Sequence, residues 1–551
     1  MSCPDQETVQ GFLLPKMKQA LALFAIIVVF LNSCSQYAAP IGGKKDTLAP
    51  VMVVSTPINK QKNFKGKTVE VFFNEYIRVE NANQKILITP EPEAPFKVKI
   101  KPTSLRLSFD KPFRDSTTYT FNFTDAVKDI TENNPALSLK LVFSTGSTID
   151  SLRVEGKVTD IQTGQPTLNT LVGLYIPNDT LTPTKSKPYY FTRTDTSGVF
   201  LLENVKDGRY KLFAFDDKNL NFILNPNTEK VAFLKGDLNL TADNDTLNLQ
   251  LFSFYNTPPR SVRTQQMVNT YTYVFDRAIE KYAIRFTNPE DSIPSYFRTP
   301  TELTFFNVKA TTDTIRVKIS VTDSLKNTTE LTQKFKFRTS TRRETPEPVT
   351  ITAKPVDNGD SDRNLEVVLE FSKPMKQITP DSLQLFSDST NRISLTQQDY
   401  RWEDNQTRFV LTKSTTARNN LILRLGRGAF ISALNDSTAR TELNYTIRDP
   451  EKYGVLTGRV NTSSKQFIVE LLDENFKLVQ KQLNNPTYRF INIKPGRYRL
   501  RVIIDENGNG RWDSGNVTEN RLPEPIFFFT RNKGLIPIKA NFDISEDVDA
   551  F

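Results

Sequence analysis

One short loop near the end of the chain carries the side chains best suited to binding a metal ion. Oxygen-bearing side chains occupy its positions 1, 3, 5 and 9, as Asp505, Asn507, Asn509 and Asp513. Gly510 follows at position 6, where a calcium loop bends sharply so that oxygen ligands converge on a hard cation. Position 12 is Asn516 instead of the usual bidentate glutamate. The same residue types are common in plain turns, so a calcium site and a simple hairpin both remain open.

A related loop lies earlier in the chain. Its oxygen-bearing side chains stand at matching positions, as Asp217, Asn219, Asn221 and Asn225. Phe222 occupies the place of the glycine, and a bulky side chain disfavours the sharp bend that glycine permits. Calcium is the one cofactor that the sequence suggests, and we expect the earlier loop to be free of metal.

Histidine is absent and cysteine is nearly so, which excludes most catalytic chemistry. The 551 residues include no His and two Cys, Cys3 and Cys34. This composition removes Ser-His and Cys-His nucleophile pairs, His-ligated metals and disulfide frameworks. No GxSxG motif is present, and no phosphate-binding loop stands in a strand-to-helix context. We expect a non-enzyme without catalytic residues, with a carboxylate-dependent glycosidase as the less favoured alternative.

The amino terminus predicts export and lipidation. Residues 20–31 form an apolar run of 12 residues behind a positive charge. The run is shorter than the ~20 residues that span a bilayer and is typical of a secretory signal. It leads into the sequence LNSC, which resembles a bacterial lipobox. The resemblance implies lipidation of Cys34 and removal of residues 1–33, which leaves residues 34–50 as a flexible tether containing Gly and Pro.

Asp followed by Ser or Thr recurs along the chain and resembles the O-glycosylation acceptor motif of Bacteroidota periplasmic proteins. The candidate acceptor residues are Thr47, Thr180, Thr246, Ser324 and Ser437. These pairs are also ordinary turn residues, so we expect only some of them to be modified. Trp402 and Trp512 could form a platform for a sugar, although two tryptophans in so long a chain are more often core or hairpin anchors.

Two pairs of internal repeats indicate the elements that must position these residues. In the first pair, apolar side chains alternate with polar ones, which is typical of antiparallel sandwich strands. The matched segments are TVEVFF (68–73) with LEVVLEF (365–371), and TYTFNF (118–123) with LILRL (421–425). They predict two copies of one module, over residues 51–149 and 346–449.

The second pair of repeats is sharper. FLLENVKDGRY (200–210) corresponds to YRFINIKPGRY (488–498), and both segments lead into a loop rich in Asp and Asn. These copies cover residues 150–250 and 450–551. Residues 251–345 have the same rhythm of strands and turns, which predicts a further sandwich there. Sustained helical periodicity is absent beyond the signal, so we expect an all-β protein.

Two known domain types resemble these modules. FFNEYIRVENANQKILITP (72–90) and LRLSFDKPFRDSTTYTFNF (105–123) resemble the bacterial Ig-like domain first described in S-layer proteins. TDTSGVFLLENVKDGRYKL (194–212) and its partner copy resemble the transthyretin-like or carboxypeptidase-regulatory-like sandwich. The resemblances imply tandem Ig-like and transthyretin-like β-sandwiches in an extended array, as in outer-membrane lipoproteins of the Bacteroidota.

The charge pattern and the resemblance together indicate an envelope partner. The net charge of +10 comes from 72 basic and 62 acidic residues that are interspersed, which argues against a nucleic-acid partner. The resemblance implies a lipid-anchored outer-membrane scaffold that docks on envelope proteins, such as a machine that secretes or assembles outer-membrane proteins. Some lipoproteins of the Bacteroidota reach the cell surface through an acidic cluster just after the lipidated cysteine. No such cluster follows Cys34, so the resemblance favours the periplasmic leaflet over the cell surface. A glycan-binding accessory lipoprotein is the alternative.

Overall fold

The computed structural model describes residues 45–551, apart from residues 138, 178–181, 256, 340–347 and 389. Over these residues the chain consists of short strands, with helical turns of only three or four residues. The prediction of an all-β fold of tandem sandwiches is confirmed. Within the described part of the chain, the structure contains no helix with the length and hydrophobicity needed to span a bilayer.

The first module, residues 51–149, is a sandwich of antiparallel sheets. One sheet has the order β1-β2-β6-β5 and another the order β4-β7-β9, while β3 pairs with β8. Val69 and Val71 from β2 meet Tyr119 and Phe121 from β7 in one core. The elements are β1 Met52–Thr56, β2 Thr68–Phe73, β3 Ile77–Val79, α2 Ala82–Lys85, β4 Leu87–Thr89, β5 Phe96–Lys101, β6 Ser104–Phe109, β7 Thr118–Asn122, β8 Val127–Asp129 and β9 Lys140–Ser144.

The fourth module, residues 346–449, repeats this strand order. The sheet β25-β27-β32-β31 corresponds to β1-β2-β6-β5, and β29-β33-β35 corresponds to β4-β7-β9. Leu369 and Leu423 are fully buried, as their alternation predicts. The elements are β25 Ile351–Lys354, β26 Gly359–Ser361, β27 Asn364–Phe371, β28 Met375–Ile378, η2 Pro380–Ser382, β29 Leu383–Phe386, β30 Arg392–Ile393, η3 Gln397–Asp399, β31 Tyr400–Glu403, η4 Asp404–Gln406, β32 Arg408–Ser414, β33 Asn420–Leu425, β34 Phe430–Ser432 and β35 Thr441–Ile447.

The third module, residues 251–345, pairs the sheet β18-β19-β22-β21 with the sheet β20-β23-β24. Its core is rich in aromatic side chains, including Tyr273, Phe305 and Phe335. The elements are β18 Ser261–Gln266, β19 Thr270–Phe275, β20 Ile279–Phe286, η1 Pro289–Asp291, β21 Ser295–Thr299, β22 Glu302–Phe306, β23 Ile315–Asp323 and β24 Thr328–Phe335.

The second module, residues 150–250, has a different strand order. The sheet β13-β10-β17 contains a parallel pair, β10 with β17, and lies against β12-β11-β14-β15, which also carries β16 on β14. The elements are β10 Leu152–Asp160, β11 Leu171–Tyr175, β12 Tyr190–Arg193, β13 Val199–Val205, β14 Gly208–Phe215, β15 Val231–Phe233, β16 Leu238–Leu240 and β17 Asn244–Leu251.

The fifth module, residues 450–551, has the same order as the second. β39-β36-β43 again contains a parallel pair, and β38-β37-β40-β41 carries β42 on β40. The elements are η5 Pro450–Lys452, β36 Gly454–Asn461, β37 Phe467–Asp473, β38 Leu478–Leu483, β39 Thr487–Ile493, β40 Gly496–Ile504, β41 Ile526–Phe528, α3 Arg531–Gly534, β42 Ile536–Ile538, β43 Asp543–Ser545 and β44 Val548–Asp549.

Glycine stands at the same place in both of these modules because a neighbouring backbone lies too close for a side chain. A Cβ on Gly156 would lie 2.3 Å from the carbonyl oxygen of Leu247, and one on Gly458 would lie 1.7 Å from that of Glu546. The parallel strand at the end of each module therefore requires a glycine in the first strand.

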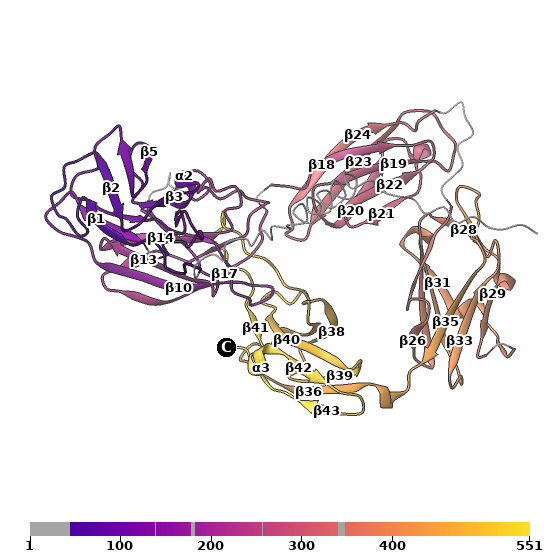
Figure 1. Ribbon diagram of the computed structural model, residues 1–551. Helices are drawn as coiled ribbons and strands as arrows, with labels where there is room; N and C mark the ends of the chain where they lie inside the picture. Colours follow the sequence, from indigo (N-terminus) through magenta and orange to yellow (C-terminus); the bar gives the residue numbers. More distant parts are fainter. Residues whose placement is uncertain (1–44, 138, 178–181, 256, 340–347, 389) are drawn as a thin grey trace, which may run out of the picture.

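The array bends back on itself, so that the fifth module lies against the second (Figure 1). The prediction of an extended array is therefore wrong for the fifth module, which folds back against the second. Lys494 of the fifth module pairs with Asp360 of the fourth at 2.6 Å, and Arg511 pairs with Glu280 of the third. These contacts join the second, third, fourth and fifth modules into one closed arrangement. The first module contacts the second.

The contact between the second and fifth modules is a separate hydrophobic layer. Leu171 and Phe215 contribute from the second module, and Ile468 and Ile503 from the fifth. All four side chains are buried. Strands β11 and β37 are apolar on both faces because one face fills their own sandwich and the other fills this layer. Burial of this second face is what bends the array back.

Candidate functional site

The structure brings the predicted metal ligands together in one loop after β40. Asp505 is 3% exposed, and its carboxylate accepts hydrogen bonds from the backbone of Asn509 (3.0 Å) and Gly510 (2.8 Å). The side-chain amides of Asn507 and Asn509 both donate to Asp513. The four side chains therefore converge, and hydrogen bonds within the loop close the turn.

Glu524 is a further acidic group at this loop that the sequence reasoning missed. Its carboxylate accepts hydrogen bonds from the backbone of Glu506 (2.9 Å) and Asp513 (2.8 Å). Burial raises the pKa of Glu524, and the nearby carboxylates of Asp513 and Asp505 add to this shift. Three carboxylates at one turn are a donor set that suits Ca²⁺, which prefers oxygen ligands.

The position of Glu524 has a counterpart in the second module. Glu229 accepts backbone hydrogen bonds from Lys218 (3.2 Å) and Asn225 (2.8 Å) in the related loop. Glu524 lies two residues before β41, and Glu229 lies two residues before β15. This repeated spacing is the sequence signal that could have found Glu524. Asn516, the residue at position 12, instead exchanges backbone hydrogen bonds with Arg521.

An arginine neutralises the related loop of the second module. The carboxylate of Asp217 accepts from the backbone of Asn221 (3.0 Å) and pairs with Arg193 at 2.7 Å. Phe222 adopts a left-handed backbone conformation with φ of 64°. The Arg193 guanidinium lies 5.6 Å from the centre of the Phe222 ring, within reach of a cation–π interaction. The guanidinium of Arg193 therefore pairs with Asp217, the aspartate that corresponds to Asp505 of the fifth module. In the fifth module a metal ion would take the place of this guanidinium.

The Asp505 loop lies where three modules meet. Ser514 donates a hydrogen bond at 2.5 Å to the carbonyl oxygen of Ser253, two residues after β17, the last strand of the second module. Arg511 forms its ion pair with Glu280 of the third module. Trp512 donates to the carbonyl oxygen of Glu524 at 2.9 Å and packs against the hydrophobic layer. The shape of this loop is therefore coupled to the contacts among the second, third and fifth modules.

A buried ion pair of the fifth module lies at the layer between the second and fifth modules, and its arginine reaches across to the second. Arg501 pairs with Glu470 at 2.7 Å, and their side chains are 12% and 11% exposed. Arg501 also donates to the carbonyl oxygen of Gln162 in the second module at 2.6 Å. One guanidinium thus satisfies a buried carboxylate and a carbonyl group of the other module.

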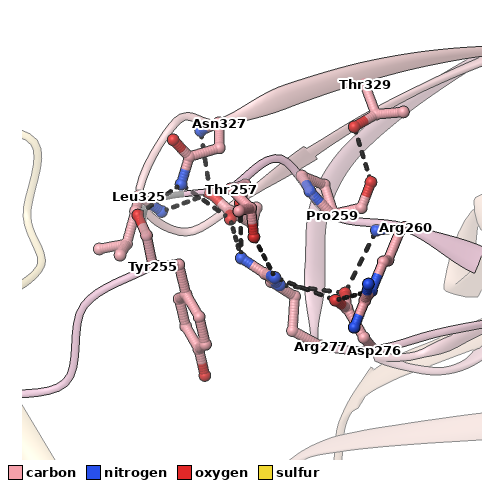
Figure 2. Close-up of polar contacts among 10 residues, drawn as sticks. Tyr255, Thr257, Pro259, Arg260, Asp276, Arg277, Leu325, Asn327 and Thr329 are labelled. Carbon is pink, nitrogen blue, oxygen red and sulfur yellow. Dashed lines mark hydrogen bonds and ion pairs between the residues drawn. The ribbon is translucent and has the colours of Figure 1, made fainter. Parts of the chain in front are cut away.

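A second polar network fixes the connection between the second and third modules (Figure 2). Arg277 is 6% exposed and forms a two-pronged ion pair with Asp276, with both contacts at 3.0 Å. It donates at 2.9 Å to the carbonyl oxygen of Thr257, which lies in the linker between the end of β17 and the start of β18. Its guanidinium also lies 4.1 Å from the centre of the Tyr255 ring. The linker is therefore tied to the third module by a buried charge.

The predicted modification sites are distributed over several surfaces. Thr47, Thr246, Ser324 and Ser437 are exposed, whereas Thr180 and the lipidation residue Cys34 lie outside the described residues. The carboxylates of Asp46 and Asp323 each accept a backbone hydrogen bond from the residue two positions on, at 2.9 Å. These aspartates therefore form turns, which leave the adjacent hydroxyl groups at the surface.

The two tryptophans pack against aromatic and hydrophobic layers instead of forming a shared platform. Trp402 lies 5.0 Å from Phe409 and 5.8 Å from Phe430 between ring centres. Trp512 packs against the layer between the second and fifth modules. They serve as anchors of two different modules.

An acidic cluster that the sequence reasoning did not identify lies at the start of the first module. The carboxylates of Asp46, Glu75 and Asp129 approach within 4.8 Å of one another. Burial raises the pKa of Glu75, and the charges of Asp46 and Asp129 reinforce that shift. Asp129 already accepts backbone hydrogen bonds from Glu132 and Asn133. The side-chain amide of Asn134 donates to the carbonyl oxygens of Asp46 (3.0 Å) and Leu48 (3.2 Å), and these hydrogen bonds hold the entry of the chain at the β8 turn.

Comparison with known proteins gives one family match, over the first module, and several similar solved structures. Residues 46–145 match the family model of the bacterial Ig-like domain. The Bacillus anthracis TIE protein is 12% identical to this chain. The match covers 92% of this chain and 75% of the TIE protein chain, with a TM-score of 0.13. The surface layer protein SbsC, domains 1–6, is also 12% identical to this chain. The match covers 90% of this chain and 68% of the SbsC chain, with a TM-score of 0.15.

A third similar structure is the Bacteroides ovatus protein SGBP-B, solved with a mixed-linkage heptasaccharide. It is 10% identical, covering 67% of this chain and 89% of that chain with a TM-score of 0.18. No curated protein matches the sequence. The family match and the antiparallel sandwich of the same residues together show that the array begins with a bacterial Ig-like module.

Proposed function

We propose that this chain is a non-enzymatic, lipid-anchored scaffold of the outer membrane that docks on other envelope proteins. Cys34 would carry the lipid, with the protein on the periplasmic leaflet. The partners would include a machine that secretes or assembles outer-membrane proteins. The finer family assignment belongs to this proposal: a Bacteroidota lipoprotein whose second and fifth modules are transthyretin-like.

The observation that carries the proposal is the packing of the fifth module on the second. A chain of independent sandwiches would hold partners at variable distances, because inter-domain motion is the default for small interfaces. Here a hydrophobic layer and the hydrogen bond from Arg501 to the carbonyl oxygen of Gln162 fix the fifth module against the second. Such a closed frame supports a role in which partners are held at fixed separations.

Strand β5 is the edge best suited to docking in the first module, next to the lipid-bearing terminus. It pairs with β6 on one side, and no other described strand pairs with it. Five of its six residues are exposed, including Val98 (36%) and Ile100 (48%). Open edges with apolar side chains accept a strand from a partner. Lysines on an edge strand oppose pairing with most other strands, so the three lysines of β5 restrict the partner to a strand that carries acidic residues.

Calcium binding and glycosylation are secondary parts of the proposal. A cation held by Asp505, Asn507, Asn509 and Asp513 would strengthen the loop at which three modules meet. Sugars on Thr47, Thr246, Ser324 or Ser437 would occupy exposed turns. Neither feature is required for the scaffold role.

Affinity purification from detergent-solubilised membranes, followed by mass spectrometry, tests the proposal. The wild-type protein should co-purify with a reproducible set of envelope proteins. Val98→Glu with Ile100→Glu should lose them, because charge on both exposed positions opposes strand addition. Val262→Glu on β18, a 55% exposed valine on another edge strand, is the matched control and should retain them. Recovery of the same proteins with the wild type and with both variants would refute docking at β5, and recovery of none with the wild type would refute the scaffold role.

A further inference from the structure

A cavity of about 640 Å³ lies at the seam between the third and fourth modules. Two hydrogen bonds hold the seam: Tyr296 donates to the carbonyl oxygen of Phe371 at 3.0 Å, and Asn405 donates to that of Ser295 at 3.1 Å. Both modules line the cavity, so it exists only when they are docked. Its volume falls within the range of small-molecule sites, about 300 to 1,000 Å³.

An exposed tyrosine forms the aromatic side of the cavity. Tyr282 on β20 is 39% exposed, and its ring meets that of Phe297 edge to face with 4.9 Å between centres. Phe297 in turn contacts the buried Phe275 at 5.9 Å. The Tyr282 ring is thus supported from behind and open in front, which gives a ligand an apolar surface next to water.

The fourth module presents a strained turn to the same cavity. Asp404, Asn405 and Gln406 all have positive φ, at 48°, 54° and 61°, although none of them is glycine. Left-handed backbone is unfavourable for residues other than glycine, and three such residues in succession are held in place by the surrounding contacts. The Asn405–Ser295 hydrogen bond supplies one of these contacts across the seam. Strain of this kind gathers at binding sites.

The strained turn leaves a carboxylate available to a ligand. Asp404 lines the cavity, and its side chain forms no hydrogen bond or ion pair with the described residues. It lies near Tyr282: burial raises the pKa of the tyrosine, and the charge of Asp404 contributes to the shift. An unpaired acceptor therefore stands beside the open aromatic ring.

The lining indicates the chemical class of the ligand. The hydroxyl groups of Thr350, Thr352 and Ser372 line the fourth-module side, and Arg298 lies on the other. Two further charged side chains of the lining already have ion-pair partners: Glu370 pairs with Lys354, and Arg408 pairs with Glu403. A lipid acyl chain is disfavoured, because it would remove water from these polar groups without replacing their hydrogen bonds. An anionic ligand is disfavoured as well, because the negative charge of Asp404 would repel it. A neutral sugar offers an apolar face of C–H groups and many hydroxyl groups that both donate and accept.

We infer that this cavity binds one or two sugar rings of a neutral glycan, with a sugar face on Tyr282 and hydroxyl groups donating to Asp404. The site is separate from the β5 edge and does not depend on the scaffold role. Because both modules form it, ligand binding would also stabilise their seam.

Isothermal titration of the full chain with neutral hexasaccharides tests this inference. The probes are β-1,4-glucan, α-1,4-glucan, xylan and chitin hexamers. At least one should bind, and Tyr282→Ala should weaken that binding by about tenfold or more, equivalent to about 1.4 kcal/mol. Asp404→Asn should weaken it by a smaller factor, because an amide oxygen still accepts. Tyr76→Ala, at a 60% exposed tyrosine in the first module, is the matched control and should bind as the wild type does.

Thermal melting of each variant separates loss of the site from loss of the fold. Tyr282 is partly exposed, so Tyr282→Ala should melt close to the wild type. If that variant unfolds, Thr352→Trp, which fills the cavity without removing a core side chain, should abolish binding instead. Absence of heat with all four probes, or unchanged affinity in the variants at Tyr282 and Thr352, would overturn the inference.

Discussion

Phe222 and Gly510 occupy matching places in two related loops, and both have left-handed backbone, with φ of 64° and 76°. Glycine adopts this conformation without strain, whereas phenylalanine does not. The ring of Phe222 packs against Phe191 with 5.0 Å between centres, and Lys187 lies 5.5 Å from it. Phe222 also lines a cavity together with Ile86 and Ile88 of the first module. Packing at this seam between the first and second modules thus compensates for backbone strain that the fifth module avoids.

Substitutions at these two positions should therefore act by different mechanisms. Gly510→Ala should cost about 1 kcal/mol from backbone strain alone, because its Cβ would meet only Leu483, at 3.5 Å. Phe222→Ala should cost more, about 2 kcal/mol, because it removes apolar contacts at the seam. Urea unfolding of the full chain measures both. Equal stability of Phe222→Ala and the wild type would show that the ring contributes no net packing energy.

Arg501→Ala should strongly destabilise the closed arrangement. Removing one partner of a buried ion pair leaves the other charge unpaired and typically costs about 3 to 5 kcal/mol. Here Glu470 would remain in the layer between the modules, and the carbonyl of Gln162 would lose its donor. Small-angle scattering should show an expanded particle. Arg497→Ala is the control, because Arg497 is exposed in its pair with Glu474, and the same dimensions for both variants would contradict the prediction.

Calcium should raise the melting temperature of the fifth module if the Asp505 loop holds the ion. Binding to the folded state alone stabilises it by about 1.4 kcal/mol when calcium exceeds Kd tenfold. The Asp505→Ala, Asp513→Ala double variant should lose the difference between calcium and chelator, measured by differential scanning calorimetry. Asp217→Ala is the comparison, since Arg193 already pairs with that carboxylate. Identical wild-type curves in calcium and chelator would leave the loop as a hairpin turn.

Glu524 should make stability fall as pH rises above its ordinary pKa of 4.5. Burial raises the pKa of this carboxyl in the folded state, so between the unfolded and folded pKa values the native protein holds a proton that the unfolded chain has lost. Raising the pH across this window therefore favours unfolding. In chelator, the melting temperature of the wild type should fall relative to Glu524→Gln as the pH goes from about 4.5 towards neutrality. Parallel curves for the two proteins would contradict the prediction.

Alternation along the strands was sufficient to predict much of the fold. Tyr119, Phe121 and Phe123 are fully buried, as are Leu421 and Leu423 in the fourth module. These positions depend on local geometry, because successive side chains of a strand point to opposite faces and only one face meets the core. The same locality explains why the four ligands of the Asp505 loop converge: they are close in sequence and one turn gathers them.

The tertiary structure alone decided which surfaces cover the second faces of β11 and β37. Their continuous apolar runs, LVGLY and FIVELLD, indicate burial on both sides but not the identity of the covering surface. Likewise Glu524 reaches the Asp505 loop from a later segment, and Asp404 reaches Tyr282 from another module. Contacts between distant segments depend on how whole modules dock, and the period of one strand carries no information about that. The sequence therefore determined the modules and their local turns, while docking between modules decided the closed arrangement and the sites at its seams.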